Sequence, residues 1–364
     1  MPGDVGPEPI LGKSLIGRSV LAVAISLFAV QQIKVSATPD FAQDYAAGWA
    51  FLHGRSIYTP TAELLAECWP HHTFTKLAGI RQPHPPWATL LAVPLALFSF
   101  ETARLVWCLL CALAVWGGWQ LARTDLMSCL VTAPIWCIAL VLGTHEPVLF
   151  LLIAAALLLL IRAPVIAGAC LALCIALKAY PAVLLIGVLL GRQWRCLTAA
   201  IVGTAALTLF AELILGFGVT AQWLGVVAHS TAGYVDSPHN SSLVRLVYAV
   251  FPVRPMAIAA VLAAILIWPQ LRHRRPEDPI RPMVPVMLLA SPISWRHYMG
   301  LVNVLELGRI EQFCLALAGG LALLVSMGWI APVSEVLVQS PLVLVLIVLW
   351  MRTLKSNGKS PLRG

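Results

Sequence analysis

Long apolar runs alternate with short polar segments along nearly the whole chain of 364 residues. The first run covers about residues 19–33, and runs of this kind are typical of helices that cross the ~30 Å hydrocarbon core of a bilayer. Further runs begin near Trp87, Thr102, Leu126, Pro147, Pro164, Leu197, Pro255, Pro282, Tyr298, Phe313 and Pro341. The pattern predicts an all-α, polytopic integral membrane protein with about twelve spans, built as a single membrane domain over residues 1–364. The span after Tyr298 is expected to be short.

Two polar stretches interrupt the apolar pattern, residues 34–85 and residues 217–242. Within the first, Asp40–Gly54 mixes apolar and aromatic residues in a way that predicts a helix lying in the membrane interface. Gly54 is expected to end that helix, since glycine is common just after a helix C-terminus. We expect both stretches to be loops on the same side of the membrane.

Composition excludes a soluble globular protein. Hydrophobic residues make up 60% of the chain and charged residues only 11%, whereas soluble proteins carry about 25% charged residues. The net charge of +8 does not indicate nucleic-acid binding, because Lys and Arg fall mostly between the apolar runs. No nucleic-acid partner is therefore expected.

Basic residues also predict the topology, since they concentrate in cytoplasmic loops. The first run is interpreted as an uncleaved anchor that starts in the cytoplasm. Alternating from there puts Arg192, Arg195, the cluster Arg272–Arg275 and the basic tail inside. The chain is then a multi-pass protein of the cell (plasma) membrane with both termini cytoplasmic, and residues 34–85, 217–242 and 291–298 lie outside.

Cysteine and histidine spacing suggests no metal site. Eight of the nine cysteines lie in or at the ends of apolar runs, where they are expected to be small core residues. The pair His71-His72 has no third ligand at the spacing that metal sites use. We assign no metal and no other cofactor from the sequence, and the use of a divalent ion stays open.

Two carboxylates, Asp40 and Asp44, follow the first apolar run directly. Acidic side chains are rare in membrane proteins and are often functional where they occur. A carboxylate at this place could act as general base on a substrate presented at the membrane surface, although Asp40 could equally cap a short helix. Arg55 and Tyr58 follow in the same loop and complete a first polar cluster.

Two more clusters lie at or within apolar runs. His84 precedes two prolines that suit a first helical turn, and we expect it to face the outer surface. Lys178 and Pro181 interrupt a long apolar run, so that freed backbone groups must be satisfied inside the protein. Lys178 could snorkel to an interface or pair with a carboxylate such as Glu212.

The fourth cluster joins the segment Ser291–Tyr298, which contains Arg296 and His297, to a loop that contains Asn240. Arg296 could be no more than an external anchor. Three of the four clusters nevertheless converge on the outer face. A base with cationic groups nearby is what a reaction that expels a phosphate requires.

Five segments in order resemble glycosyltransferase family 87. They are DFAQDYAAGWAFLHGRSIYTP, HPPWATLLAVPLAL, GACLALCIALKAYPAVLLIGVLLGRQWR, HNSSLVRLV and SPISWRHY. The resemblance covers most of the chain from Asp40 to Tyr298. It implies a membrane glycosyltransferase of the C-type fold that uses a polyprenyl-phosphate sugar, in many members mannose, with residues 34–85 as the external catalytic loop.

The resemblance also implies roles for individual residues. Asp40 matches the family's first acidic residue after the first span, which makes it the general base of an inverting transfer, with Asp44 as a second acid/base candidate. A single base suffices because phosphate is already a good leaving group, unlike the leaving group of glycosidases. Candidates for binding the donor phosphate are Arg296, His297 and, more weakly, Lys178. Candidates for binding the acceptor or the sugar are His84, Tyr58 and Asn240.

The implied partners are a polyprenyl-phosphate sugar with its tail in the lipid bilayer and a glycan or glycolipid acceptor. The chain departs from the family at Asp44, where members often carry an aromatic residue, and at Thr144-His145-Glu146. The rival interpretation is a transporter or flippase, which the broken helix near Lys178 would suit. Internal repeats are common in transporters, and the absence of a second copy of any cluster favours an enzyme.

Overall fold

A computed structural model of the chain describes residues 10–33, 39–69, 79–237, 239–272, 278–326 and 335–358. Within these ranges the protein is helical and contains no β-strand, which confirms that the fold is all-α. The α-helices are α1 (Ile10–Ile33), α2 (Pro39–Leu52), α3 (Thr61–Cys68), α4 (Pro86–Ala92), α5 (Phe100–Leu121), α6 (Leu126–Leu142), α7 (Glu146–Leu159), α8 (Pro164–Leu177), α9 (Leu184–Leu190), α10 (Trp194–Leu215), α11 (Val219–Tyr234), α12 (Leu243–Val250), α13 (Pro255–Ile267), α14 (Met283–Ala290), α15 (Arg309–Ser326) and α16 (Glu335–Gly358). The 3₁₀ helices are η2 (Leu95–Leu97), η3 (Tyr180–Val183), η4 (Trp268–Arg272) and η5 (Arg296–Val304).

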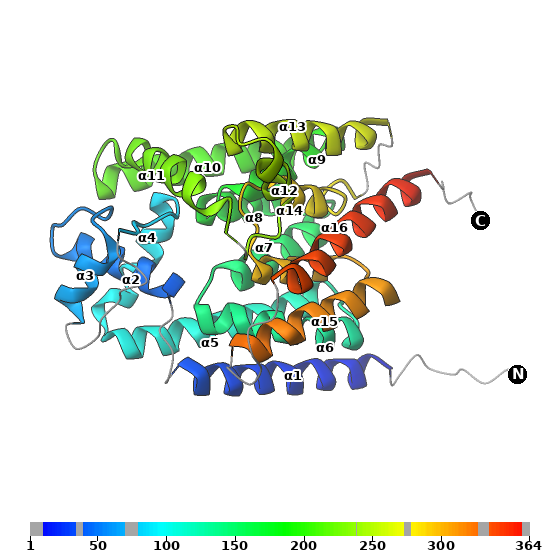
Figure 1. The fold of residues 1–364 in the computed structure, drawn as a ribbon, viewed down its shortest axis with the longest axis horizontal. Coiled ribbons are helices and arrows are strands. Elements are labelled where there is room, and N and C mark those ends of the chain that lie inside the picture. Colours follow the sequence, from blue (N-terminus) through cyan, green and yellow to red (C-terminus); the bar gives the residue numbers. More distant parts are fainter. Residues whose placement is uncertain are drawn as a thin grey trace, which may run out of the picture.

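The long helices run side by side, and the short helices α2, α3 and α4 gather at one end of them (Figure 1). The start of α1 and the end of α16 both lie at the opposite end. A chain whose first and last helices point to one end fits the prediction that both termini share a side of the membrane. Which compartment that side faces stays a prediction.

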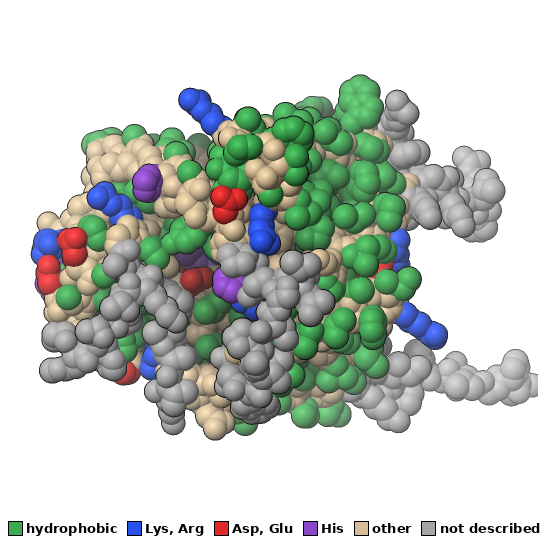
Figure 2. Space-filling view, viewed as in Figure 1, with side chains coloured by type: hydrophobic (Ala, Val, Ile, Leu, Met, Phe, Trp, Pro, Cys, Tyr) green, Lys and Arg blue, Asp and Glu red, His purple; other side chains and the backbone are tan. Residues whose placement is uncertain are grey.

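Three of the described helices are long and apolar enough to cross a bilayer, namely Leu15–Ile33 in α1, α5 and α10. Several shorter apolar helices of 10–17 residues accompany them. The membrane character predicted from the sequence is therefore confirmed, while the number of twelve spans stays a prediction. Figure 2 shows apolar side chains spread over the long helices, with charged side chains at the α2–α4 end and others near the centre and at the opposite end.

Two predicted spans are much shorter than a membrane helix. The run after Tyr298 forms η5, whose nine residues rise only about 18 Å at the 3₁₀ spacing, well below the ~30 Å of a hydrocarbon core. The run from Trp87 forms α4, which ends at Ala92 shortly before Pro94. The apolar residues of η5 are buried in the protein, and those of α4 are buried in part. Sequence alone does not distinguish burial in protein from burial in lipid.

Helix α2 matches the predicted helix closely, and Gly54 follows it with a φ of +65°. Its sides are covered by protein, however, instead of lying on a lipid surface. Tyr45 packs edge-on against Phe100 and donates a hydrogen bond to the Phe98 carbonyl at 2.9 Å. A methyl group on Gly48 would come within 2.9 Å of the α4 backbone, so α2 and α4 are in direct contact. The helix that carries Asp40 is thus rigidly held.

The external segments predicted to share a side do meet. The backbone N–H of Ser241 donates to the Ser294 carbonyl at 2.7 Å, and Asn240 forms a bridge with Trp295. Trp223, on α11 within the predicted loop 217–242, donates through Nε1 to the Pro83 carbonyl at 3.0 Å. Through residues 217–242, these contacts link all three segments that are predicted to lie outside.

Candidate functional site

Asp40 and Asp44 lie one turn apart on α2 and therefore on the same face of that helix. Asp44 is buried, and its Oδ1 accepts a hydrogen bond from Gln82 Nε2 at 2.7 Å and lies 2.8 Å from His84 Nδ1. His145 Nε2 lies 3.6 Å from the other oxygen, Oδ2. Burial acts to raise the pKa of Asp44, but the histidines and the two bonds outweigh it and hold that pKa below its ordinary value.

Asp40 experiences the opposite balance. Loss of hydration raises the pKa of its carboxyl from 3.8 to about 6, and the nearby Lys178 ammonium and His84 oppose this rise only in part. A carboxylate with a pKa close to neutral is a better proton acceptor than an ordinary aspartate, while still being ionised at neutral pH. The two carboxylates of α2 are therefore chemically distinct, one poised to take a proton and one held as an anion.

Lys178 lies where the long apolar run breaks. Helix α8 ends at Leu177, the backbone of Lys178 is extended, and the 3₁₀ helix η3 begins two residues later. The break lets the ammonium reach Glu146 Oε1 at 2.7 Å and the hydroxyl of Tyr298 at 3.2 Å, with both Lys178 and Glu146 buried. The helix break predicted from Pro181 is confirmed.

The pairing of Lys178 with Glu212, considered from the sequence, is wrong. Its partner is Glu146, at the first turn of α7, which packs beside α8. Glu212 instead accepts from the backbone N–H groups of Gly218 and Thr220 at 2.6 and 2.8 Å and so joins α10 to α11. The carboxylate close in space is the one at the start of the preceding helix.

The neighbours Arg296 and His297 point to different places. His297 is buried, and its Nε2 lies 3.8 Å from Glu146 Oε2, so that it joins the group around Lys178. Arg296 is half-buried, with Nη2 3.0 Å from His239 Nδ1 in the facing loop. The two donor-phosphate candidates therefore approach the site from different depths.

His84 does not face the outer surface as predicted. It is buried, points at Asp44, and meets His145 edge-on with ring centroids 4.6 Å apart. Pro85 and Pro86 begin α4 as expected, and this turn directs the imidazole inward. Asp44, His84 and His145 each offer one ligand atom within 4.8 Å of the others, a set that can hold a metal ion. The pair His71-His72 lies outside the described residues.

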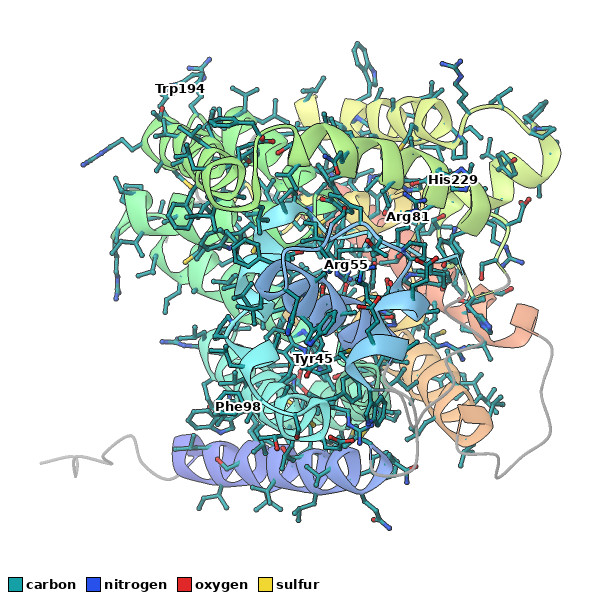
Figure 3. The ribbon with its side chains drawn as sticks, turned by 90° about the vertical axis from the view of Figure 1, so that its left-hand side faces the viewer. Tyr45, Arg55, Arg81, Phe98, Trp194 and His229 are labelled. Atoms are coloured by element: carbon teal, nitrogen blue, oxygen red, sulfur yellow. The ribbon has the colours of Figure 1, made fainter. Side chains whose placement is uncertain are left out.

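The remaining candidates separate into three settings. Arg55 pairs with Glu67 at 2.7 Å on the exposed surface and does not join Asp40. Tyr58 is buried and lines a cavity of about 570 Å³ together with Arg81 and His229. Figure 3 looks onto this end of the molecule and shows the two basic side chains close to each other, His229 coming from α11.

Asn240 is occupied by the protein itself. Its Nδ2 donates to the carbonyls of Val235 and Pro292 at 3.1 and 2.9 Å, and its Oδ1 accepts from the N–H groups of Ser242 and Ser294 at 3.1 and 2.9 Å. Both donor protons and the carbonyl are used. The amide holds the two external segments together, which makes a positioning role the natural one for this side chain.

Several buried side chains around Asp44 and Glu146 have polar atoms without a hydrogen-bond partner. Buried polar atoms are normally hydrogen-bonded to protein or to water, so each exception is a position that a water molecule, an ion or a substrate could fill. Within the described part of the chain, the buried side-chain atoms that have no hydrogen-bond partner include Asp44 Oδ2, Tyr58 Oη, His145 Nδ1, Glu146 Oε2, Ser294 Oγ and His297 Nε2.

Sequence reasoning missed Glu146, His145, Gln82 and Arg81 as members of this region. A signal existed for two of them, because Thr144-His145-Glu146 is a polar triplet at the start of an apolar run. A buried lysine 32 residues later requires a carboxylate, and the first turn of the preceding helix could have been considered. No comparable signal points to Gln82 or Arg81.

Of the three comparisons with known proteins, one gave a match. The sequence profile of glycosyltransferase family 87 matches residues 83–292, more than half of the chain. The match includes His84, Glu146 and Lys178, whereas Asp40 and Arg296 lie outside it. Searches of curated proteins and of solved structures found no match.

Proposed function

The chain belongs to glycosyltransferase family 87, and on that premise we propose that it transfers a hexose, mannose, from a polyprenyl-phosphate sugar to a glycan or glycolipid. The reaction takes place at the outer face of the plasma membrane and inverts the anomeric centre. Because the family consists of glycosyltransferases, the transporter interpretation is not pursued further.

The observation that carries the proposal is Asp40, a carboxylate with a pKa of about 6 close to the buried Lys178 ammonium. An acceptor hydroxyl must lose a proton while the donor loses a phosphate. A base and a fixed positive charge near each other are suited to these two events. Asp40 lies on a helix that is held on nearly all sides, which favours a defined geometry.

In the proposed step, Asp40 accepts the proton of the acceptor hydroxyl as its oxygen attacks the anomeric carbon. The new carbon–oxygen bond forms on the face opposite the phosphate, and the bond to the phosphate oxygen breaks with its electron pair. The products are the glycosylated acceptor and polyprenyl phosphate, and the proton remains on Asp40 until solvent removes it. General base catalysis of this kind contributes roughly 10²–10⁴-fold.

Lys178 is the stronger candidate for the departing phosphate, ahead of Arg296. Its ammonium has three donors, of which Glu146 and Tyr298 take two, so one remains for a phosphate oxygen. His297, with an unpartnered Nε2 nearby, is a second donor. Arg296 is suited to an earlier contact with the lipid phosphate, as it lies farther out beside His239.

The cavity lined by Tyr58, Arg81 and His229 is our candidate for the acceptor. Its volume of about 570 Å³ is that of a site for a small ligand. Hydroxyl, amide and basic side chains line it, which suits the hydroxyls of a sugar. His84 contributes from beneath by fixing Asp44, and Asn240 by holding the external loops together.

Purified protein, polyprenyl-phosphate mannose and a panel of glycan acceptors would test the proposal, with release of polyprenyl phosphate as the readout. Asp40→Asn should lose at least roughly a hundredfold in rate. Glu63→Gln, a matched change at an exposed carboxylate of the same external region, should behave as wild type. Wild-type activity of Asp40→Asn would overturn the assignment of the base, and loss in Asp44→Asn alone would move that role to Asp44.

A further inference from the structure

We propose that Asp44, His84 and His145 bind a divalent transition-metal ion, with zinc as the best match. The proposal reverses the absence of a metal inferred from the sequence, where these three residues are separated by up to 101 positions. It concerns binding alone and does not depend on the reaction proposed above.

The three residues are already close to a metal-binding geometry. One ligand atom from each lies within 4.8 Å of the other two. The 3.6 Å between His145 Nε2 and Asp44 Oδ2 is long for a hydrogen bond and close to the ~3.4 Å that separates two ligands of a tetrahedral ion with bonds of ~2.0–2.1 Å. His84 Nδ1 lies 2.8 Å from the other oxygen, Asp44 Oδ1, and would have to exchange that hydrogen bond for a bond to the ion.

An unsatisfied carboxylate oxygen points to the ligand. Asp44 is 3% exposed and His145 1% exposed, and Asp44 Oδ2 has no hydrogen-bond partner in the described part of the chain. Leaving a carboxylate oxygen buried and unpaired is unfavourable. A cation bound between Oδ2 and the imidazole would satisfy it.

The charge around the cluster is also suited to a dication. The carboxylates that act on one another here belong to Asp40, Asp44 and Glu146, and the cation among them is Lys178. With neutral imidazoles, two negative charges remain uncompensated when all three carboxylates are ionised. A divalent ion would balance them.

The ligand types favour zinc over magnesium or calcium. Two imidazoles and one carboxylate are a set that zinc takes readily, whereas magnesium and calcium prefer oxygen ligands. Three protein ligands leave a fourth position for water or a substrate oxygen. Gln82 supports the set by donating to Asp44 Oδ1 at 2.7 Å, as outer partners of metal ligands usually do.

Such an ion would tie three separate elements together, since Asp44 lies on α2, His84 precedes α4, and His145 precedes α7. It would fix the helix that carries Asp40 against the start of the apolar helix α7. A bound ion is therefore expected to stabilise the folded protein.

The test uses the full chain, purified in detergent through an affinity tag without histidines and carrying His71→Ala and His72→Ala to remove a possible background. Protein stripped with EDTA and reloaded with Zn²⁺ should contain about one zinc per chain by elemental analysis, and Co²⁺ should give a visible absorption band. Bound zinc should raise the melting temperature, because a ligand that binds only the folded state stabilises it.

His145→Gln should weaken zinc binding by more than the roughly 10–100-fold that follows loss of an outer hydrogen-bond partner. His53→Gln, at an exposed histidine next to α2, is the matched control and should bind as the parent. Failure of the parent protein to bind zinc or cobalt would overturn the proposal without any variant. Undiminished binding by His145→Gln would overturn it as well, whereas inactivity in sugar transfer would bear only on the proposed reaction.

Discussion

Asp40 and Asp44 have the same side chain and lie four residues apart, but their pKa values are shifted in opposite directions from the ordinary value. Asp44 is surrounded by Gln82, His84 and His145, which stabilise its anion. Asp40 is half-buried and loses part of its water without gaining a direct partner among the described residues, so its anion is less stable. The setting of Asp40 suits a general base, because a less stable anion accepts a proton more readily. The setting of Asp44 suits a stable anion that holds other groups in place.

The pKa of Asp40 predicts the acid limb of the pH profile. The base must be ionised to accept a proton, so kcat/KM should fall about tenfold per pH unit below a pH of about 6. Initial rates of polyprenyl phosphate release across a pH series would measure it. An acid limb with its midpoint at the ordinary aspartate pKa would contradict the raised pKa of Asp40. The control Glu63→Gln should show the same acid limb as wild type.

The same shift predicts that Asp40 reduces stability at neutral pH. A carboxyl whose pKa is higher in the folded than in the unfolded state favours folding when protonated. This contribution is full below the unfolded value of 3.8 and is lost as the pH rises through about 6. Asp40→Asn should therefore melt at a higher temperature than wild type at pH 7.5, and the gap should close toward pH 4. Scanning fluorimetry in detergent checks both, and a gap independent of pH would exclude the carboxyl as its cause.

Lys178 and Glu146 should behave as a unit. Removing one partner of a buried ion pair leaves an uncompensated charge and costs about 3–5 kcal/mol. Lys178→Met should therefore be strongly destabilised, and Glu146→Gln in the same chain should recover most of the stability. Neither protein should transfer sugar if Lys178 contacts the donor phosphate. Thermal melting and single-turnover transfer separate these effects, and full activity of the double variant would remove Lys178 from the site.

At the scale of elements, α2 is positioned by the turn between α6 and α7. Gly143 has a φ of +72°, and its carbonyl accepts from Trp107 Nε1 at 2.8 Å. A Cβ built on Gly143 would lie 2.5 Å from the Cβ of Phe41, the neighbour of Asp40. The turn is therefore packed directly against Phe41, the neighbour of the proposed base.

Gly143→Ala should push Phe41 away and displace Asp40 with it. A misplacement of about 1 Å at a reacting group can cost roughly 10²-fold in rate, so we expect a loss of that order in kcat. Gly54→Ala is the matched control, because Gly54 also has a positive φ, +65°, but nothing lies within 4 Å of its Cβ position. An equal loss of rate in the two variants would show that backbone strain, and not the contact with Phe41, causes the loss. Full activity of Gly143→Ala would show that the contact does not position Asp40.

Elements with a strong local signal could be predicted from the sequence, and α2 is the clearest case. Its apolar and aromatic positions, together with Gly54, gave its limits to within two residues. The short helices α4 and η5 could not be distinguished from spans, since an apolar run has the same composition in lipid and in a protein core. The inward turn of His84 and the partner of Lys178 depend on packing between distant segments, and no periodicity along the chain encodes them.

For the whole molecule, the arrangement predicts which ends can be reached from outside the cell. Ser56, exposed beside the cavity, and Arg195, exposed at the start of α10, are suitable positions for cysteine labelling. In a Cys68→Ser background the other cysteines are buried or half-buried. Ser56→Cys should react with an impermeant maleimide in intact cells, and Arg195→Cys only after permeabilisation. The reverse pattern would put the chemistry on the cytoplasmic side.

The hydrogen bond between Lys178 and Tyr298 has a consequence for the order of events during synthesis. The two residues are 120 positions apart, so the ribosome must add a third of the chain before the lysine can meet its second partner. Until Tyr298 has been synthesised, Lys178 and Glu146 lack the segment that encloses them in the folded protein. The proposed active site therefore forms late, long after the first helices of the chain have been synthesised.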